Sequence, residues 1–471
     1  AGEVEARGMG ALMEGEEMFI GVLALTQSHG IGFSPSLLLK HKNSFEKARG
    51  DIEAEAARLV GHPVLLSSPQ QVCSLLYEEL KLPPPNSRAG EVGAMNKFKG
   101  ANQTHTTNEE TLQALSALHP LPGLILEHRH ISKMLNTFIN PLCEKAVRSR
   151  SAPSSASSGG GGCCTIHTRF LHTGTATGRL SSAEPNLQNV PKAESMRFEN
   201  RTDISATINV REAFVGRFGR TLLSADYVQC EIRVLAHFSQ DKKLLGLLQD
   251  IGVCPYVSVA SCVTGKAPHL VTPSERGVFK MVMLGLVYGL GVRALASKLQ
   301  MTEGEAARHI QSFYATFPGV KAFQQKVVQQ ARRDGFVRTL KGRRRALPDV
   351  LLQGGSMSGR RSYAERQAVN TVIQGSAADI MKAAMRDVSV ALADTGLCER
   401  ARVCLQIHDE LLLEVEEGAL EECARLVGEC LTTCVDLTVP MKVKMVAGKS
   451  WGTLESYEIG PDGHPSQHPS Q

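Results

Sequence analysis

The chain has 471 residues, 21% of them charged and 42% hydrophobic, and a formal net charge of +5. This composition excludes a disordered or fibrous protein, and the length favours two or three lobes over one domain. Apolar runs such as residues 19–25 are much too short to span a membrane, so we expect no membrane segment. The 12 cysteines include no CxxC pair and no Cys/His zinc spacing, which suits buried thiols in a reducing compartment.

The first third of the chain has mainly helical patterns. Residues 1–17 are rich in Glu and Gly, so we expect a loose lead-in there, and the missing initiator Met suggests a fragment of a longer chain. Residues 36–61 have the spacing of one amphipathic helix, and helical spacing returns at residues 108–147 after a Pro- and Gly-rich loop at residues 82–107. The Ser/Gly-rich run at residues 151–162 has the composition of a linker, and we assign it no chemistry.

The rest of the chain mixes strands with helices. Residues 221–238 begin like a strand and end like a helix, and helices dominate residues 240–335. Residues 403–415 contain two strand-like runs joined at a charged tip, which predicts a hairpin that pairs with a later strand at residues 438–448. These patterns predict a helical first lobe followed by an α+β lobe with a large helical insertion.

Acidic side chains stand at the ends of two of these strands. Asp226 follows an apolar run, and His408, Asp409 and Glu410 form the tip of the hairpin. A helix cap would explain Asp226, and a tight turn that uses His-Asp would explain the tip. Two such carboxylates on neighbouring strands could instead hold a pair of Mg²⁺ ions about 3.5–4 Å apart, as in phosphoryl transfer. Hard oxygen ligands suit Mg²⁺ better than zinc.

A basic track is expected on one helix. Residues 272–275 form a capping box with Pro at the first helical position, which predicts that a helix starts there. The side chains along one track of this helix are Arg276, Lys280, Leu284 and Tyr288. Its two cations could neutralise a triphosphate above a metal site, although a solvated basic face is the alternative. Gly285 and Gly289 suggest the close approach of a partner surface, such as a base pair.

Several motifs resemble those of a known enzyme family. Residues 226–233, the R-x3-K-x7-YG pattern at residues 276–289 and the HDE tip at residues 408–410 have the order and spacing of the three polymerase motifs of the A-family DNA polymerases. Residues 172–191 and 364–379 are similar to two further family blocks, and the resemblance covers nearly the whole chain. Within the family, the runs GRRRALP, AERQAVN and AGKSWG make the chain most similar to the eukaryotic DNA polymerase nu, with polymerase theta next.

The resemblance implies a multidomain α+β protein with a right-hand fold, made of a helical thumb, an antiparallel-sheet palm and helical fingers. The implied divisions are a lead-in at 1–17, the thumb at 18–165, the palm at 166–235 and 346–457, the fingers at 236–345 and a flexible tail at 458–471.

The family likeness also implies a function and a metal site. It implies a template-directed DNA polymerase that adds deoxynucleotides to a primer 3′ end with two Mg²⁺ ions. Asp226 and Asp409, helped by the Tyr227 carbonyl, are implied to bind the ions, with Glu410 as an accessory carboxylate. The implied catalytic set is Asp226, Asp409, Lys280, Arg276 and Glu410.

The implied nucleotide site adds side chains from two motifs. Arg276 and Lys280 are implied to hold the triphosphate, and Lys280 to donate a proton to pyrophosphate. Glu231 resembles the steric gate of the family, placed where a ribose 2′-hydroxyl would have to fit. Leu284 stands at a position that is aromatic in most relatives, so nucleotide affinity or sugar discrimination is expected to differ. The implied dNTP-binding residues are Tyr227, Gln229, Glu231, Arg276, Lys280, Leu284 and Tyr288.

DNA contacts are expected from other blocks. Arg366, Asn370 and Gln374 are spaced to form one polar stripe on a helix, suited to minor-groove acceptors, although a solvated stripe would look the same. The likeness adds Arg179, Asn186, Gln188, Asn189 and His408 as primer-template contacts. Arg129 and Lys133 could grip duplex phosphates or belong to a solvated helix face, and we interpret residues 341–345 (KGRRR) as phosphate-binding.

The biological role is expected from the nu likeness alone. It implies DNA repair or translesion synthesis in the nucleus, with unknown protein partners. No exonuclease carboxylate motif precedes the expected thumb, which predicts that this chain does not proofread. The alternatives are a DNA-binding scaffold with weakened catalysis and a single-subunit RNA polymerase. The two Asp residues and Lys280 argue against the first, and Glu231 as a gate argues against the second.

Overall fold

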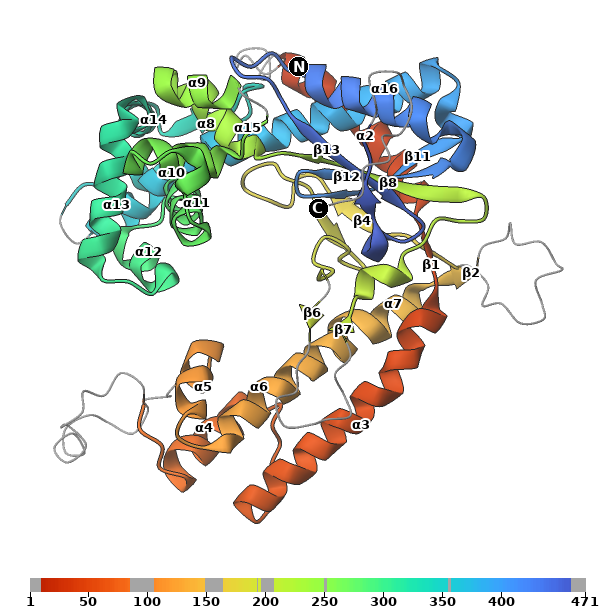
Figure 1. The fold of residues 1–471 in the computed structure, drawn as a ribbon, viewed down its shortest axis with the longest axis vertical. Helices are drawn as coiled ribbons and strands as arrows, with labels where there is room; N and C mark the ends of the chain where they lie inside the picture. The colour runs from red at the N-terminus through yellow and green to blue at the C-terminus, as the bar shows by residue number, and fades with distance from the viewer. Residues whose placement is uncertain are drawn as a thin grey trace.

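The computed structural model describes residues 10–84, 106–148, 164–192, 194–195, 207–249, 252–354 and 357–458. Three parts are visible: a lobe built on a β-sheet, a lobe of helices beside it, and an elongated helical arm below (Figure 1). We call these parts the sheet lobe, the helical lobe and the arm. Most of the expected loop at residues 82–107 lies outside the described residues. The linker at residues 151–162 and the tail after residue 458 lie wholly outside them.

The sheet lobe contains a five-stranded antiparallel sheet with the order β11-β12-β8-β13-β14. Its strands are β8 (Arg220–Tyr227), β11 (Ala401–Ile407), β12 (Glu410–Glu416), β13 (Val443–Gly448) and β14 (Glu455–Ser456). The predicted hairpin is confirmed as β11 and β12. The prediction that it pairs with the last strands was wrong, because β8 lies between β12 and β13. Residues 221–225 are all buried, which suits a central strand.

Three helices pack around this sheet. They are α2 (Gly10–His29), the 37-residue α15 (Ser358–Asp394) and α16 (Leu420–Thr433). The expected loose lead-in at residues 1–17 is wrong from Gly10 onward, because α2 begins there and packs against β11 and α15. Phe19 is buried at 1% exposure and Glu16 pairs with cations far along the chain, so tertiary contacts order a segment with no strong local helix signal.

The helical lobe matches the helices expected between residues 240 and 335. Its helices are α8 (Cys230–Ser239), α9 (Lys242–Gln249), α10 (Pro255–Thr264), α11 (Pro273–Val287), α12 (Val292–Leu299), α13 (Glu303–Thr316) and α14 (Pro318–Asp334), followed by the hairpin β9 (Phe336–Arg338) and β10 (Arg344–Ala346). The predicted capping box of α11 is confirmed: the Glu275 backbone N–H donates to Thr272 Oγ1 at 3.2 Å, and the Thr272 N–H donates to Glu275 Oε2 at 3.0 Å.

The arm is built on the long helix that the sequence predicted. Its helices are α3 (Pro35–Val60), α4 (Pro69–Ser74), the π-helix η1 (Leu75–Glu79), α5 (Glu109–Ser116), α6 (Pro120–Lys133), the π-helix η2 (Met134–Ile139) and α7 (Asn140–Lys145). A small sheet of β1 (Ile31–Phe33), β3 (Cys164–Ile166) and β2 (Val147–Arg148) connects the arm to the rest. Arg129 donates to the carbonyl and hydroxyl of Thr107, so it is not a plainly solvated side chain.

Short elements complete the chain. They are the strands β4 (Arg169–Leu171), β5 (Ser181–Ala183), β6 (Glu194–Ser195) and β7 (Thr207–Ile208), and the 3₁₀ turns η4 (Val210–Ala213), η5 (Pro268–Leu270), η6 (Pro348–Leu351), η8 (Leu397–Glu399), η9 (Glu417–Ala419) and η10 (Trp451–Thr453). Among the helices of the described residues, none is long and apolar enough to cross a membrane.

A buried ion pair fixes one end of the sheet. Glu414 of β12 has no exposed surface, and its carboxylate accepts from Arg217 Nε at 2.7 and 2.9 Å and from the Arg217 backbone N–H at 2.7 Å. Arg217 also donates to the His29 carbonyl at 3.1 Å, so the same guanidinium ties α2 to the sheet.

We predict that Arg217→Met lowers the free energy of unfolding by about 3–5 kcal/mol, because it leaves a fully buried carboxylate without its cation. Urea denaturation followed by circular dichroism measures this change. Arg169→Met is the matched control, since it breaks an Arg–Glu pair whose side chains are 57% and 67% exposed. That control should cost about 0–1 kcal/mol, and equal effects of the two substitutions would contradict the prediction.

Candidate active site and nucleic-acid surface

Two acidic strand ends meet at one edge of the central sheet. Glu410, the first residue of β12, lies directly opposite Asp226 of β8 in the antiparallel register. The Tyr227 backbone N–H donates to the Asp409 carbonyl at 3.0 Å, so the hairpin turn is bonded to the end of β8. His408 adopts a positive φ of 53° in this turn, which turns the chain sharply enough to present Asp409 beside Asp226.

The electrostatics of this edge favour a bound cation. Desolvation and the negative charges of Glu410 and Asp409 raise the pKa of Asp226 to about 7. Burial also raises the pKa of Asp409, although Arg179 and His408 oppose the shift. The described residues contain no group of three or more His, Cys, Asp and Glu side chains arranged to hold a metal. Two carboxylates nevertheless fit Mg²⁺, which protein sites commonly bind through one or two carboxylates together with substrate phosphates.

A second cluster joins three segments beside Asp409. Arg179 Nη2 donates to Glu231 Oε1 at 2.7 Å and lies 3.6 Å from Asp409 Oδ1. The Tyr288 hydroxyl, at the end of α11, lies 3.1 and 3.2 Å from the two Glu231 oxygens. Glu231 is only 6% exposed, and burial raises its pKa while Arg179 opposes the shift. The sequence analysis assigned Glu231 and Tyr288 to the nucleotide site, Arg179 to DNA and Asp409 to the metal site, and nothing local in the sequence indicated that Arg179 connects Glu231 to Asp409.

Arg276 and Lys280 project together from α11, as the sequence predicted, and both are exposed. The Arg276 Cζ and Lys280 Nζ atoms lie 5.8 and 6.0 Å from the ring centroid of Tyr256. Sequence reasoning assigned no role to Tyr256, and no local signal could have shown that α10 brings its ring under both cations. Because an aromatic face attracts cations, the ring holds the two side chains near each other. Leu284 is half-buried on the same helix.

Two predicted nucleotide-site residues have structural contacts. The Tyr227 ring is buried and its hydroxyl donates to the Leu431 carbonyl at 2.6 Å, so its side chain is committed to the core. Gln229 adopts a positive φ of 54° before α8, and its buried Oε1 atom has no hydrogen-bond partner. An unpartnered buried oxygen is costly, so a ligand donor that reached Gln229 Oε1 would relieve that cost.

The predicted stripe on α15 is only partly solvated. Arg366 is exposed, Asn370 is half-buried and Gln374 is 8% exposed, so the stripe runs from the surface into the protein. Gly289 has a φ of 69°, and a Cβ there would lie 2.8 Å from the Arg366 Cβ. Gly289 therefore closely approaches Arg366 of the same chain, while Gly285 makes only ordinary contacts, and the approach of a base pair stays a prediction.

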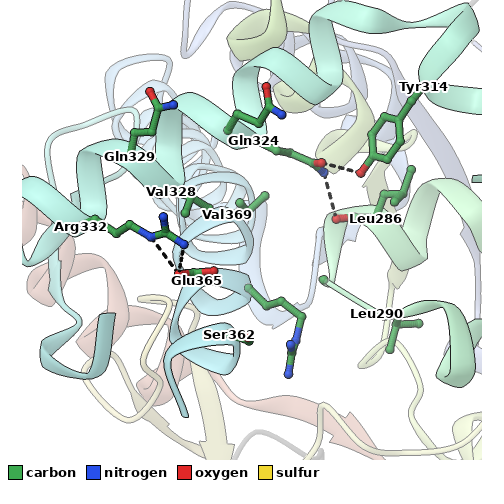
Figure 2. Close-up of a pocket in the computed structure, with 13 residues that line it drawn as sticks. Leu286, Leu290, Tyr314, Gln324, Val328, Gln329, Arg332, Ser362, Glu365 and Val369 are labelled. Atoms are coloured by element: carbon green, nitrogen blue, oxygen red, sulfur yellow. Dashed lines mark hydrogen bonds and ion pairs between the residues drawn. The ribbon is translucent and has the colours of Figure 1, made fainter. Parts of the chain in front are cut away.

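A pocket of about 510 Å³ opens beside Arg366 and Gly289, between α11, α13, α14 and α15. Figure 2 shows Gln324, Tyr314 and Leu286 along one side of it and the Arg332–Glu365 ion pair on the other. The sequence analysis did not predict this pocket, because its walls come from four helices that are separated along the chain.

Residues 186–189 support the hairpin tip. Asn186 Oδ1 accepts from the backbone N–H groups of Gln188 and Asn189 at 3.1 and 3.2 Å, so it shapes its own turn. The Gln188 amide donates to the carbonyl and side-chain oxygens of Gln406 at 3.1 and 3.0 Å, and the Gln406 amide donates to the His408 carbonyl. Through Gln406, Gln188 therefore holds the backbone that leads to His408. The side chains of His408 and Asn189 are both exposed.

A second pocket, lined by several basic side chains, borders Asp226. Its volume is about 360 Å³, and its lining includes Asp226 with Lys192, Arg211 and Lys444. Lys444 of β13 stands opposite Asp226 in the sheet register, so Lys444, Asp226 and Glu410 form one row across three strands. The Arg211 guanidinium stacks on Trp451 with its Cζ 4.0 Å from the ring centroid. Lys444 is the one cation of this row, Lys192 and Arg211 line the same pocket, and none of the three was predicted as a site residue from the sequence.

Known proteins that resemble this chain identify its family. A model described as DNA polymerase family A matches residues 36–453. The chain belongs to DNA polymerase family A. It is 37% identical over 430 residues to "DNA polymerase I, thermostable" of Thermus filiformis, and 34% identical over 442 residues to DNA polymerase I of Chloroflexus aurantiacus. These matches cover 91% and 94% of this chain but 47% and 43% of the relatives, so the chain spans about half of their length.

A solved structure supports the same assignment. The POL domain of Pol1 from M. smegmatis, in a complex with DNA primer-template and dNTP, superposes with a TM-score of 0.76 at 35% identity, over 93% of this chain and 70% of that one. This family A chain therefore has the expected right-hand fold of mixed helix and sheet.

We predict that the Asp226 carboxyl of the metal-free chain titrates near pH 7, as followed by ¹³C NMR and assigned with Asp226→Asn. Its ionised form is the disfavoured one, so its penalty to folding grows as pH rises from about 4 to 7. Glu410→Gln removes a neighbouring negative charge and should lower this midpoint. Glu416→Gln, at the opposite end of β12, should leave it unchanged, and an unmoved midpoint in Glu410→Gln would contradict the prediction.

Proposed function

We propose that this family A chain is a template-directed DNA polymerase that extends a primer 3′ end with deoxynucleotides by two-metal phosphoryl transfer. The observation that carries the proposal is the meeting of Asp226 and Asp409 at one sheet edge, within a fold whose helical lobe presents Arg276 and Lys280. A pair of carboxylates supplies the oxygen ligands that divalent ions need, and the two cations supply counter-charges for a triphosphate.

Asp226 and Asp409 would hold the two Mg²⁺ ions, with the Tyr227 carbonyl as a further oxygen ligand. When bound, such ions activate the primer hydroxyl and stabilise the charge of the leaving pyrophosphate. Because the pKa of Asp226 is raised to about 7, metal binding near neutral pH would displace a proton from the fraction of Asp226 that is still protonated. Glu410 accepts from Ser224 Oγ at 2.6 Å, which suits an accessory carboxylate whose orientation is fixed within the sheet.

The nucleotide would bind between α11 and the sheet edge. Arg276 and Lys280, aligned by the Tyr256 ring, would hold its phosphates, and Lys280 would donate a proton to the leaving group. Glu231 would exclude a 2′-hydroxyl, since Arg179 and Tyr288 hold its carboxylate in one place. Leu284, Gln229 and Tyr288 would contact the nucleotide or the template base.

The primer-template would follow the polar residues that lead from this site. We propose Arg179, Gln188 and His408 as contacts near the primer terminus, with Asn186 and Asn189 beside them. Arg366, Asn370 and Gln374 would face the minor groove, as their graded burial on α15 supports. Arg366 also borders the 510 Å³ pocket of Figure 2, which suits the unpaired template strand.

We also propose a biological role for the chain and its division into thumb, palm and fingers. The nu-like and theta-like sequence runs support a role in DNA repair or translesion synthesis in the nucleus, and the absence of an exonuclease motif supports synthesis without proofreading by this chain. The proposed thumb, palm and fingers keep the boundaries expected from the sequence, except that α2 packs on the sheet, so we place the start of the thumb at Pro35.

We predict that the chain extends a primed DNA template with dNTPs and Mg²⁺, and that Asp409→Asn or Asp226→Asn reduces the rate by about 10³-fold, because each removes a metal ligand worth several kcal/mol. Gel-resolved primer extension measures this rate. Asp394→Asn, at the exposed C-terminal end of α15, is the control and should keep the parent rate. DNA binding without extension by the parent would instead support the scaffold alternative.

We predict that Glu231→Ala raises the use of rNTPs relative to dNTPs by about 10- to 100-fold, because it opens the space that a 2′-hydroxyl needs. Single-nucleotide incorporation with each class of substrate gives the ratio of kcat/KM values. Glu231→Gln keeps the bulk of the side chain and should change this ratio far less. An unchanged ratio in Glu231→Ala would remove Glu231 from the gate.

A further inference from the structure

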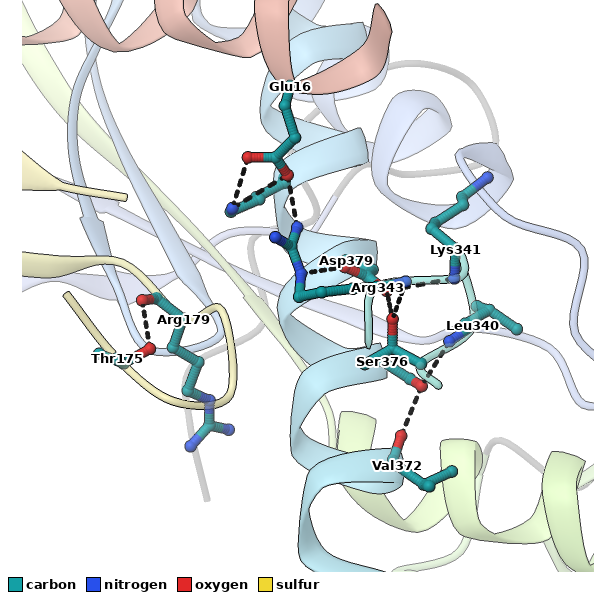
Figure 3. Close-up of polar contacts among 11 residues, drawn as sticks. Glu16, Thr175, Arg179, Leu340, Lys341, Arg343, Val372, Ser376 and Asp379 are labelled. Carbon is teal, nitrogen blue, oxygen red and sulfur yellow. Dashed lines mark hydrogen bonds and ion pairs between the residues drawn. The ribbon is translucent and has the colours of Figure 1, made fainter. Parts of the chain in front are cut away.

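The N-terminal part of α2 contributes to a buried ionic cluster. Glu16 accepts from Arg343 and from Lys382 Nζ, the latter at 3.0 and 3.1 Å, and Arg343 Nε lies 3.2 Å from Asp379 Oδ1 (Figure 3). The Asp379 side chain is 1% exposed and that of Lys382 is 7% exposed. Two cations and two carboxylates balance here, so removing any one leaves an uncompensated charge in a poorly solvated place.

The loop between β9 and β10 is fixed to α15 by the same cluster. Asp379 accepts from the Thr339 hydroxyl and from the Lys341 backbone N–H, the latter at 3.1 Å. The Leu340 N–H donates to Ser376 Oγ at 2.9 Å. The sequence analysis interpreted this KGRRR segment as phosphate-binding, but Arg343 is occupied by Glu16 and Asp379. The other two arginines are also engaged, since Arg344 stacks on Phe336 and Arg345 donates to Thr371.

Arg343 packs against the loop that carries Arg179. Gly178 has a φ of 83°, and a Cβ there would lie 2.6 Å from Arg343 Nε. On the α15 side, a Cβ at Gly375 would lie 3.1 Å from the Thr177 carbonyl. The Thr175 hydroxyl closes the loop by donating to the Arg179 carbonyl at 2.7 Å, and Figure 3 shows these two residues on the loop to the left of Arg343. The loop therefore rests on Arg343 and on α15 with no space to spare.

From these contacts we infer that Glu16 is a positioning residue of the active site, acting through Arg343 and Gly178 on Arg179. Arg179 is the residue that contacts Glu231 and Asp409 on the far side of the loop. Without Glu16, Arg343 and Lys382 face each other with one carboxylate between them, and the surface that supports Gly178 shifts. Misplacement of a substrate-contacting group by about 1 Å can cost up to about 10²-fold in rate. The inference rests on the proposed polymerase function, in which Arg179 contacts the primer terminus.

A double-mutant cycle with Glu16→Gln and Arg179→Ala tests the inference in the full chain. We expect Glu16→Gln to lower kcat/KM for extension of a matched primer by about 10-fold, and to change the ratio of mismatched to matched extension in the same direction as Arg179→Ala. In the Arg179→Ala background the same substitution should have less than about a twofold further effect. Glu17→Gln, an exposed neighbour on α2, should stay within about twofold of the parent.

Two further measurements separate positioning from simple destabilisation. Gly178→Ala keeps Glu16 but places a Cβ against Arg343 at a φ of 83°, so it should displace the loop and reproduce the Arg179→Ala mismatch ratio, with some loss of thermal stability. The mismatch ratio is the readout, because a smaller folded fraction lowers matched and mismatched extension equally. A full additional loss from Glu16→Gln in the Arg179→Ala background, or parent-like extension by Gly178→Ala, would overturn the inference. If the parent does not extend primers, the proposed function fails. The inference is then judged by the Arg179 Nε NMR signal, which should shift in Glu16→Gln and not in Glu17→Gln.

Discussion

The antiparallel pairing of β8 with β12 is the constraint on which the rest of the site depends. It places Glu410 opposite Asp226, and the bond from the Tyr227 N–H to the Asp409 carbonyl brings the second carboxylate to the same edge. Three acidic groups at one end of a sheet repel one another, so this arrangement is unfavourable without counter-charges. The structure accordingly surrounds them with cations from separate segments: Arg179, Lys192, Arg211 and Lys444.

The same electrostatic tension explains why Glu231 is held so firmly. A buried carboxylate next to Asp409 would favour protonation, yet Arg179 donates to it and also lies near Asp409. One guanidinium thus compensates two carboxylates that have different proposed tasks. This sharing couples the proposed selection of the sugar by Glu231 to the proposed binding of metal by Asp409. If bound DNA moved Arg179, both carboxylates would lose part of their counter-charge.

Local patterns were enough to predict the parts of the site, but not how they are connected. The hairpin, the strand end at Asp226 and the capping box of α11 depend on neighbouring residues, so periodicity and capping rules found them. The family likeness supplied the roles of Glu231 and Arg179. The central place of β8, the Tyr256 ring under two cations and the order of α2 depend on residues far apart, as with Glu16 and Lys382, which are 366 positions apart. Local sequence patterns do not show which distant residues will contact each other.

The strand order also has a consequence for how the molecule is made. Strand β8 is synthesised before the whole helical lobe, and both of its partners, β12 and β13, come from the last part of the chain. Asp226 of β8 pairs with Glu410 of β12, so more than 180 residues are synthesised between the two strands. During that part of translation both edges of β8 have no partner strand. Unpaired strand edges template aggregation, so the nascent chain is vulnerable throughout this interval. The yield of folded protein would then depend on how well β8 is protected in this interval. A chaperone, or early packing of α8 against α14, could supply that protection.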